Sequence, residues 1–238
     1  MSRLLKLLLW SVPVLALAAG LAGYWLLGTG AGRDFALRQV QGALPDGARL
    51  QWQQVDGHLG GRLQFRKLVY TDATQRHEAD SLAFDLDLPR LLFREIRIGS
   101  LQAGQVALDL PRDDTPFEFP QWPGSLPALD LPFSLSVDRL RIDGLQIAQD
   151  RQPVYALRTV AGGFRLKPGA LSIAGLQAES ADGRIGLDGF YQPNHGYATR
   201  LRGKAELKAG KDGHRPLLPF KADGDAERFL LGIEGAMP

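Results

Sequence analysis

Apolar and polar residues alternate along most of this chain. From Leu82 to Leu88, leucine and phenylalanine at even positions are separated by alanine and aspartate. The same alternation recurs over residues 106–110, 133–137 and 185–187. Successive side chains of a strand point to opposite faces, so this pattern predicts strands with one apolar and one wetted face. We expect about thirteen such strands, mostly antiparallel, in a mainly β domain that covers residues 48–238.

Two short segments have a helical pattern instead. Residues 33–47 are expected to form a short juxtamembrane helix, because apolar residues between Arg33 and Leu44 recur about every 3.6 positions. Pro45-Asp46-Gly47 should end this helix. Pro89–Phe93 is expected to form a single helical turn between two strands.

A degenerate repeat interrupts the alternation. Ile96–Leu101, Leu140–Leu145 and Leu171–Leu176 each have two apolar residues at alternate positions, then two polar or small residues, then a leucine. This one-residue slip requires a bulge or a new strand if the leucine is to stay on the same face. Such repetition favours an elongated array over a closed globule. Dipeptides and tripeptides typical of turns should separate the strands, and these are Asp56-Gly57, Gly60-Gly61, Asp143-Gly144, Gly162-Gly163, Pro168-Gly169, Asp182-Gly183 and Asn194-His195-Gly196.

An uncharged apolar run, Leu7–Leu27, precedes the alternating region. As a helix it would be about 32 Å long, enough for the roughly 30 Å core of a bilayer. The residues expected at the two membrane interfaces are Arg3, Lys6, Trp10, Tyr24 and Trp25. A cleaved signal peptide is the alternative, with a small-residue site at Ala16-Leu17-Ala18. The run continues well beyond Ala18, which favours a retained anchor.

The anchor sets the expected topology. Residues 1–32 should comprise a cytoplasmic N-terminus, the transmembrane helix and a flexible Gly-rich exit, Gly28–Gly32. The long domain that follows should lie in the periplasm, which makes this a single-pass inner-membrane protein. A Pro-rich insertion at 111–132 interrupts the strands. It is either an ordered insertion or hairpin excursion, or a flap over an apolar surface or a partner-docking loop.

Composition and charge argue against several functional classes. Lys and Arg number 28 against 26 for Asp and Glu, with the signs interspersed, so nucleic acid is not an expected partner. The chain has no cysteine, and its four histidines, His58, His77, His195 and His214, are far apart beside turn residues. We therefore expect no metal site and no cofactor. Asp113-Asp114 lacks acid–base neighbours, and phosphate-loop and nucleophile-elbow motifs are absent, so we expect no enzyme.

The apolar side of the expected sheet must be covered, because few helices are predicted to pack against it. The sheet could form a sandwich, close as a barrel, or curl into an open trough that receives a ligand, and the residues alone do not choose. The residues expected to line this side are Leu82, Phe84, Leu86, Leu88, Ile96, Ile98, Val106, Leu108, Leu135, Val137, Leu140, Ile142, Ile173, Ile185 and Leu187.

Segments spread along the whole chain resemble, in order, the N-terminal region of the TamB family, within the AsmA-like superfamily. They are the anchor with its GTGAG exit, the helix ending at Leu44-Pro45, and then Val55–Leu63, Leu68–Tyr70, Leu86–Leu92, Ile96–Ile98, Val106–Pro111 and Leu131–Val137. TamB is the inner-membrane subunit of the bacterial translocation and assembly module.

The resemblance implies a long, twisted, apolar-lined β-trough between the inner and outer membranes. It implies roles in phospholipid transport toward the outer membrane and in outer-membrane protein assembly, beside the barrel partner TamA. Family members are several times longer, so we expect a truncated product or fragment without the C-terminal domain that meets TamA. The alternatives are a structural or chaperone module that pairs its strand edges with outer-membrane proteins, and a closed β-domain of unknown function.

Overall fold

The computed structural model describes residues 21–110, 129, 132–149, 152–193, 196, 198–208, 216–225 and 228–233. Its helices are α2 (Gly30–Gly42) and the 3-10 helix η1 (Leu88–Phe93), and residues 21–28 are also helical. Its strands are β1 (Arg49–Gln51), β2 (Gln54–Gly57), β3 (Arg62–Thr71), β4 (Arg76–Leu86), β5 (Glu95–Leu110), β6 (Ser134–Gln149), β7 (Gln152–Lys167), β8 (Ala170–Ser180), β9 (Gly183–Gln192), β10 (Ala198–Leu207), β11 (Leu217–Gly224) and β12 (Phe229–Ile233).

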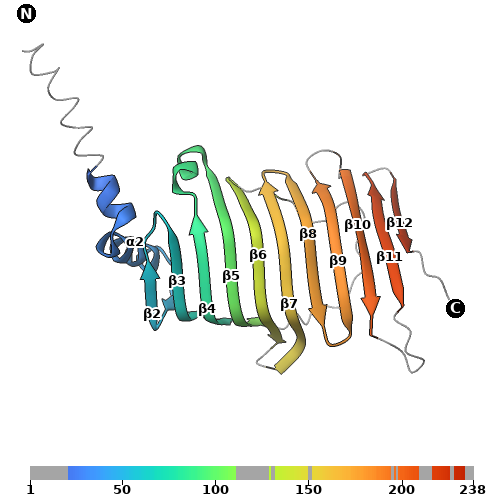
Figure 1. Cartoon of the computed structure of the whole chain (residues 1–238), viewed down its shortest axis with the longest axis horizontal. Coiled ribbons are helices and arrows are strands. Elements are labelled where there is room, and N and C mark those ends of the chain that lie inside the picture. The colour runs from blue at the N-terminus through green and yellow to red at the C-terminus, as the bar shows by residue number, and fades with distance from the viewer. Residues whose placement is uncertain are drawn as a thin grey trace, which may run out of the picture.

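All these strands belong to one long, curled sheet (Figure 1). The strand order is β1-β3-β4-β5-β6-β7-β8-β9-β10-β11-β12, and β2 pairs with β3 beside β1. The first and last strands do not pair with each other, so the sheet is open. The expectation of a mainly β, mostly antiparallel, repetitive sheet is confirmed, and so is the helical turn at η1.

One pair of neighbours, β5 and β6, is parallel, with Glu95 opposite Ser134 and Leu110 opposite Gln149. The end of β5 and the start of β6 therefore lie at opposite ends of the sheet, about 50 Å apart for strands of this length. The Pro-rich segment 111–132, which lies almost entirely outside the described residues, must make this crossover. A simple hairpin joining β5 directly to β6 would leave the two strands antiparallel, so this segment is not that kind of connection. The expected insertion, hairpin excursion, flap or docking loop within it stays a prediction.

Thr29 joins the helical residues 21–28 to α2. Its hydroxyl donates to the carbonyl of Trp25 at 2.6 Å and accepts from the amide of Gly32 at 3.1 Å, which caps α2. A Cβ on Gly32 would lie 2.3 Å from the same Trp25 carbonyl, so only glycine fits this close corner. The Gly28–Gly32 segment is thus a capped helix start, not the irregular exit that its glycines suggested.

The expected anchor, Leu7–Leu27, lies mostly outside the described residues, as do Arg3, Lys6 and Trp10. Among the described residues, none of the helices has the length and apolar character needed to cross a membrane. The juxtamembrane helix expected within residues 33–47 corresponds to α2, which begins three residues earlier and ends at Gly42.

The α2 end of the chain caps the β1–β2 edge of the sheet. Gln41 Nε2 donates to the carbonyl of Leu50 in β1 at 2.9 Å, and Arg33 Nη1 donates to that of Gly57 in β2 at 3.0 Å. The amide of Gly60, in the β2–β3 turn, donates to the carbonyl of Leu27 at 2.7 Å. These contacts occupy backbone groups that an edge strand would otherwise offer to another chain.

Two of the three slips in the sequence repeat are β-bulges inside long strands. Phe84 and Leu86 follow each other regularly on one face of β4, yet they pair with Leu101 and Ile98 of β5, which are three positions apart. The bulge between Ile98 and Leu101 therefore keeps both side chains on one face. The carboxylate of Asp85 accepts a hydrogen bond from the amide of Ser100 within this bulge.

A second repeat behaves in the same way, whereas the third keeps one register with β7 from Leu140 to Leu145. Ile173 and Leu176 pair with Gly189 and Leu187, which are two positions apart, so the bulge at Gly175 restores the face. Here the carboxylate of Asp188 accepts from the amide of Gly175 at 2.5 Å. In the third repeat, Leu140–Leu145, the slip falls at Gly144, which has a φ of +78°.

Two expected turns are therefore not turns. Asp143-Gly144 lies within β6, and Gly162-Gly163 lies within β7. A glycine with positive φ suits a bulge as well as it suits a turn. Reading both dipeptides as turns divided β6 and β7, which are continuous strands.

Gly175 provides a test of the bulges. Its φ is +57° and nothing lies within 4 Å of a Cβ built on it, so Gly175→Ala should lower the free energy of unfolding by about 1–2 kcal/mol through backbone strain alone. The matched control is Gly186→Ala in β9, where the nearest atom is 3.9 Å away and φ is not positive. This change should be neutral or stabilising by about 0.5–1 kcal/mol. Urea unfolding of the full chain measures both, and equal effects would contradict the assigned bulge geometry.

Candidate functional site: the apolar face of the sheet

Rows of apolar side chains run across the strands on one face of the sheet. Residues paired side by side on neighbouring strands share a face. The longest row crosses β3 to β11 and consists of Phe65, Leu82, Ala103, Ile142, Val160, Ala178, Ile185, Ala205 and Leu218. We call the side of the sheet that carries this row and its parallel neighbours the apolar face.

The structure brings almost all the expected lining residues together on this face. One row contains Leu86, Ile98, Val137, Phe164 and Ile173, and others contain Ile96 with Leu135, Phe84 with Leu140, Val106 with Leu145, Leu108 with Ile147, and Leu176 with Leu187. The exception is Leu88, which lies in η1 beyond the end of β4.

The sequence prediction missed several members of the face. Leu101, Leu145 and Leu176 are the leucines that follow the slip in each repeat, and the register places them in these rows. The repeat itself was the signal for them, since it already suggested that a bulge would return each leucine to the apolar side. Leu63 and Phe65 of β3 were also missed, because charged and amide residues surround them.

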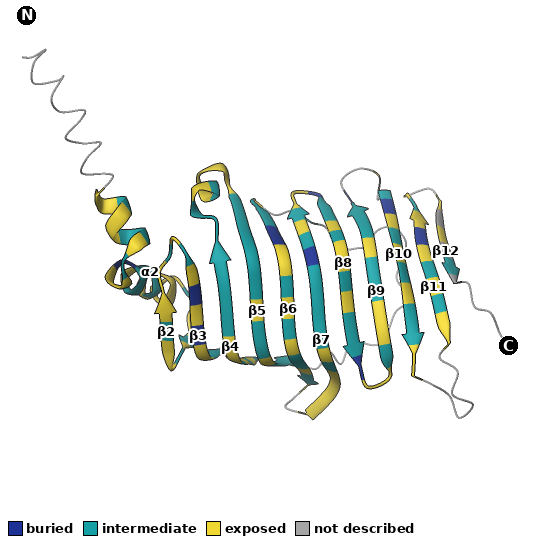
Figure 2. Ribbon diagram, viewed as in Figure 1, coloured by how far each residue is buried: buried dark blue, intermediate teal, exposed yellow. Residues whose placement is uncertain are grey.

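Little of the molecule is deeply buried. Among the described residues, the buried apolar ones are Leu63, Phe65, Val137 and Ala222, which are 2–8% exposed. Figure 2 shows intermediate exposure along most of the strands, with buried positions confined to short stretches. A sandwich or closed barrel would bury most of the inward-facing side chains. The apolar face is therefore largely without a covering layer.

Exposure on this face increases toward the end of the sheet formed by the β8–β9 turn. Ile185 is 44% exposed, Tyr155 is 47% exposed and Leu207 is 43% exposed. With Leu157 and Ala205 they form the apolar part of a shallow hollow of about 200 Å³, whose rim also includes Asp182, Arg184 and Glu206. An apolar hollow of this kind can accept a hydrocarbon group without leaving a polar atom unpaired.

Aromatic rings pack against one another on the apolar face near the β1–β2 edge, which α2 caps. Phe65 stacks on Phe84, with ring centroids 6.1 Å apart, and Trp52 meets Phe65 edge-on at 5.8 Å. Farther along β3, Tyr70 stacks on His77 at 5.9 Å. These contacts give the first strands the most consolidated packing of the described chain.

The opposite face is charged. Arg97 pairs with Asp138 at 2.8 Å, and Arg184 pairs with Glu179 at 3.2 Å. The carboxylate of Asp80, 2.6 Å from Lys67 Nζ, accepts a hydrogen bond from it and raises the pKa of that amine. These charged side chains are partly exposed, so this face is wetted and the two faces differ sharply in polarity.

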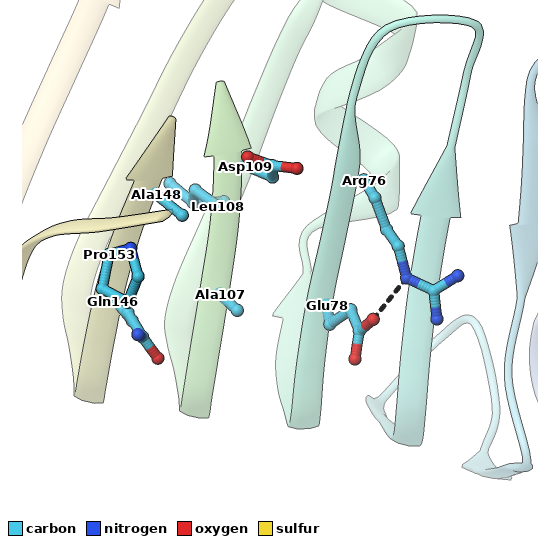
Figure 3. Close-up of a pocket in the computed structure, with 8 residues that line it drawn as sticks. All are labelled: Arg76, Glu78, Ala107, Leu108, Asp109, Gln146, Ala148 and Pro153. Carbon is cyan, nitrogen blue, oxygen red and sulfur yellow. Dashed lines mark hydrogen bonds and ion pairs between the residues drawn. The ribbon is translucent and has the colours of Figure 1, made fainter. Parts of the chain in front are cut away.

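This second face has an open hollow of about 510 Å³ at the ends of β4 to β7. Figure 3 shows the residues that line it. Its lining includes Ala107, Asp109 and Pro153, together with Arg76 and Glu78, which form an ion pair at 2.5 Å. Both charged side chains are about half exposed. The pair is therefore in contact with solvent.

The described residues contain no group of three or more histidine, aspartate or glutamate side chains arranged to hold a metal ion. His77 lies in the apolar face, with Nε2 3.0 Å from Gln75 Oε1, and His58 lies in the β2–β3 turn. His195, His214 and the pair Asp113-Asp114 lie outside the described residues.

Comparison with known proteins gives one match. The model of a family described as TamB, N-terminal domain, matches residues 19–185, well over half of the chain. The matched range runs from the N-terminal helical residues to the first residues of β9. No curated protein and no solved structure matches the chain.

Two leucines of the apolar face test whether it is open. Leu63→Ala, at a position 3% exposed, should reduce the free energy of unfolding by about 2–5 kcal/mol, because it leaves a cavity. Leu207→Ala, at a position 43% exposed, should change it by only about 0.5 kcal/mol. Urea unfolding of the full chain compares the two. A large loss at Leu207 as well would show that something covers this face.

Proposed function

We propose, because this chain belongs to the TamB N-terminal domain family, that its apolar face carries phospholipid acyl chains while the headgroups remain in water. In this proposal the chain is a periplasmic protein anchored in the inner membrane, and its curled sheet forms a trough. It has no enzymatic activity. It contributes to phospholipid transport toward the outer membrane and thereby to outer-membrane assembly. The observation that carries the proposal is the uncovered apolar face, which continues from β3 to β11.

The dimensions of the face suit a lipid. Its long strands have 16 residues, which corresponds to about 50 Å, and neighbouring strands lie about 4.8 Å apart, which is the spacing of the side chains within one apolar row. An acyl chain makes no hydrogen bonds, so it can move between such rows without losing a specific partner. The charged opposite face would stay in contact with water throughout.

The continuity of the rows supports movement rather than binding at one place. No charged residue interrupts the longest row, which mixes large residues such as Leu82 and Ile142 with small ones such as Ala103 and Ala178. The hollow beside Ile185 is shallow and open, unlike the deep pockets that usually hold one small ligand. A smooth apolar surface without deep pockets favours passage.

A second candidate is strand addition. The β1–β2 edge is capped by Gln41 and Arg33, whereas β12 pairs only with β11 among the described residues. A strand of an unfolded outer-membrane protein could extend the sheet at β12, as an edge strand allows. This candidate predicts that the chain contacts polypeptide near Leu230, which is 61% exposed.

Photo-crosslinking distinguishes these functions. A photoreactive residue at Phe84 or Leu86 should capture phospholipid in cells, because both side chains lie on the apolar face. The matched control is Ala83, which lies between them in sequence and faces the other way, paired with Gln102. Ala83 is a better control than Asp85, because Asp85 holds the bulge at Ser100.

Mass spectrometry of the crosslinked products identifies what is captured. Lipid from Phe84 and Leu86 but not from Ala83 supports the proposal. Equal lipid capture from both faces, or none from either, would contradict it. Polypeptide captured at Leu230, without lipid at Leu86, would favour strand addition.

A charge on the apolar face should block lipid binding without unfolding the sheet. Ile185→Arg is suitable because Ile185 is 44% exposed and its paired neighbours, Ala178 and Ala205, are small. The control Gln177→Arg adds the same charge on the opposite face, next to Gly186. Co-purified phospholipid should fall severalfold in Ile185→Arg and stay unchanged in Gln177→Arg, with unfolding midpoints alike. Unchanged lipid in both variants would refute a role for this part of the face.

A further inference from the structure

The connection between β4 and β5 exposes three consecutive apolar side chains. In η1, Leu91 is 42% exposed, Leu92 is 85% exposed and Phe93 is 80% exposed. The last two are among the most exposed large apolar residues of the described chain. Single exposed leucines are common on protein surfaces, but a contiguous group of this kind marks a contact surface.

The turn that carries them is held firmly. Arg90 pairs with Asp87 at 3.1 Å and with Glu95 at 2.8 Å, which ties the start of η1 to the start of β5. The amide of Arg94 donates to the carbonyl of Leu91 at 3.0 Å and ends the helix in the left-handed region. The apolar side chains are therefore presented outward by an ordered turn.

The turn lies at the same end of the sheet as the N-terminal helical residues. Arg62, at the start of β3, pairs with Asp85 near the end of β4, so η1 and the β2–β3 turn share one end of the sheet. The β2–β3 turn is bonded through the amide of Gly60 to the carbonyl of Leu27. Figure 1 shows η1 and residues 21–28 on the same side of the sheet.

The helical residues at this end are themselves exposed and apolar. Leu21 is 61% exposed, Tyr24 is 72% exposed and Trp25 is 46% exposed. They form the last part of the uncharged run Leu7–Leu27. Tyrosine and tryptophan at the end of such a run favour the boundary between lipid and water.

We propose that Leu91, Leu92 and Phe93 insert into the interfacial region of the bilayer beside the N-terminal helix, as a second attachment of the sheet to the membrane. This inference rests on the proposed membrane location. The bilayer is the favoured occupant because the apolar turn and residues 21–27, the described end of the uncharged apolar run, lie at one end of the sheet. The exposed Arg94 next to the turn suits the phosphate groups of lipids.

The attachment would place the first apolar rows at the membrane. Leu86 ends β4 directly before η1, and its partner Ile98 begins the apolar row that continues through Val137. Lipid leaving the bilayer at η1 would therefore meet the apolar face at once. Two attachments, at residues 21–28 and at η1, would also fix the orientation of the sheet relative to the membrane.

Site-specific labelling tests this insertion in the full chain, which has no native cysteine. Single variants Leu92→Cys and Phe93→Cys are labelled with an environment-sensitive fluorophore and reconstituted in vesicles of phosphatidylethanolamine and phosphatidylglycerol. The control is Val154→Cys, since Val154 is also apolar and is 60% exposed but belongs to β7 at the opposite end of the sheet.

Emission from positions 92 and 93 should shift to the blue and should be quenched by lipids with a doxyl group near the headgroup. Emission from position 154 should show neither effect. No quenching at 92 and 93, or equal quenching at all three positions, would overturn the inference. Its failure is distinguishable from that of the proposed function, which is judged by lipid captured at Leu86. Capture at Leu86 without quenching at position 92 would retain lipid binding and would remove only the second attachment.

Discussion

The structure depends on one constraint, the strict alternation of side chains along a β-strand. Strands of 16 residues can keep a single apolar face only if every departure from this alternation is corrected locally. The bulges at Gly99-Ser100 and at Gly175, together with the positive-φ residue Gly144, make these corrections. Asp85 and Asp188 accept hydrogen bonds from the backbone amides of Ser100 and Gly175 in the two bulges. Without the bulges, the leucine after each slip would face water and the apolar rows would end within a few strands.

The same constraint shows how much of the fold can be read from the sequence. Alternation predicts the strands and their apolar side, and the repeats predict where the face must be restored. The parallel pairing of β5 and β6 is not predictable in this way, because residues 111–132 show only that the strand series is interrupted. Asp143-Gly144 and Gly28–Gly32 were misread for a related reason. A glycine signals a permissive backbone, and a turn, a bulge and a close helix corner all use that permissiveness.

The candidate site is predictable to a similar degree. Alternation of apolar and polar residues predicts most of its residues. Whether these residues form a closed core depends on what packs against them, and the local sequence pattern does not contain that information. Among the described residues, Leu63 and Phe65 are buried, whereas Ile185 and Leu207 are exposed. The apolar face is therefore not a closed core along its whole length. The face is packed at the edge capped by α2 and open farther along the sheet.

The apolar face thus has a packed part, at the first strands, and an accessible part, farther along the sheet. The buried residues of β3, with Trp52 and Phe84 packed against Phe65, hold the first strands together. Farther along, the backbone ladders and the ion pairs of the charged face maintain the sheet, while its apolar side stays accessible. Apolar surface exposed to water costs free energy, so any ligand that covers it stabilises the folded state in proportion to its affinity. A protein that must receive and release hydrocarbon needs such a surface, because a fully packed face would have no place for an acyl chain.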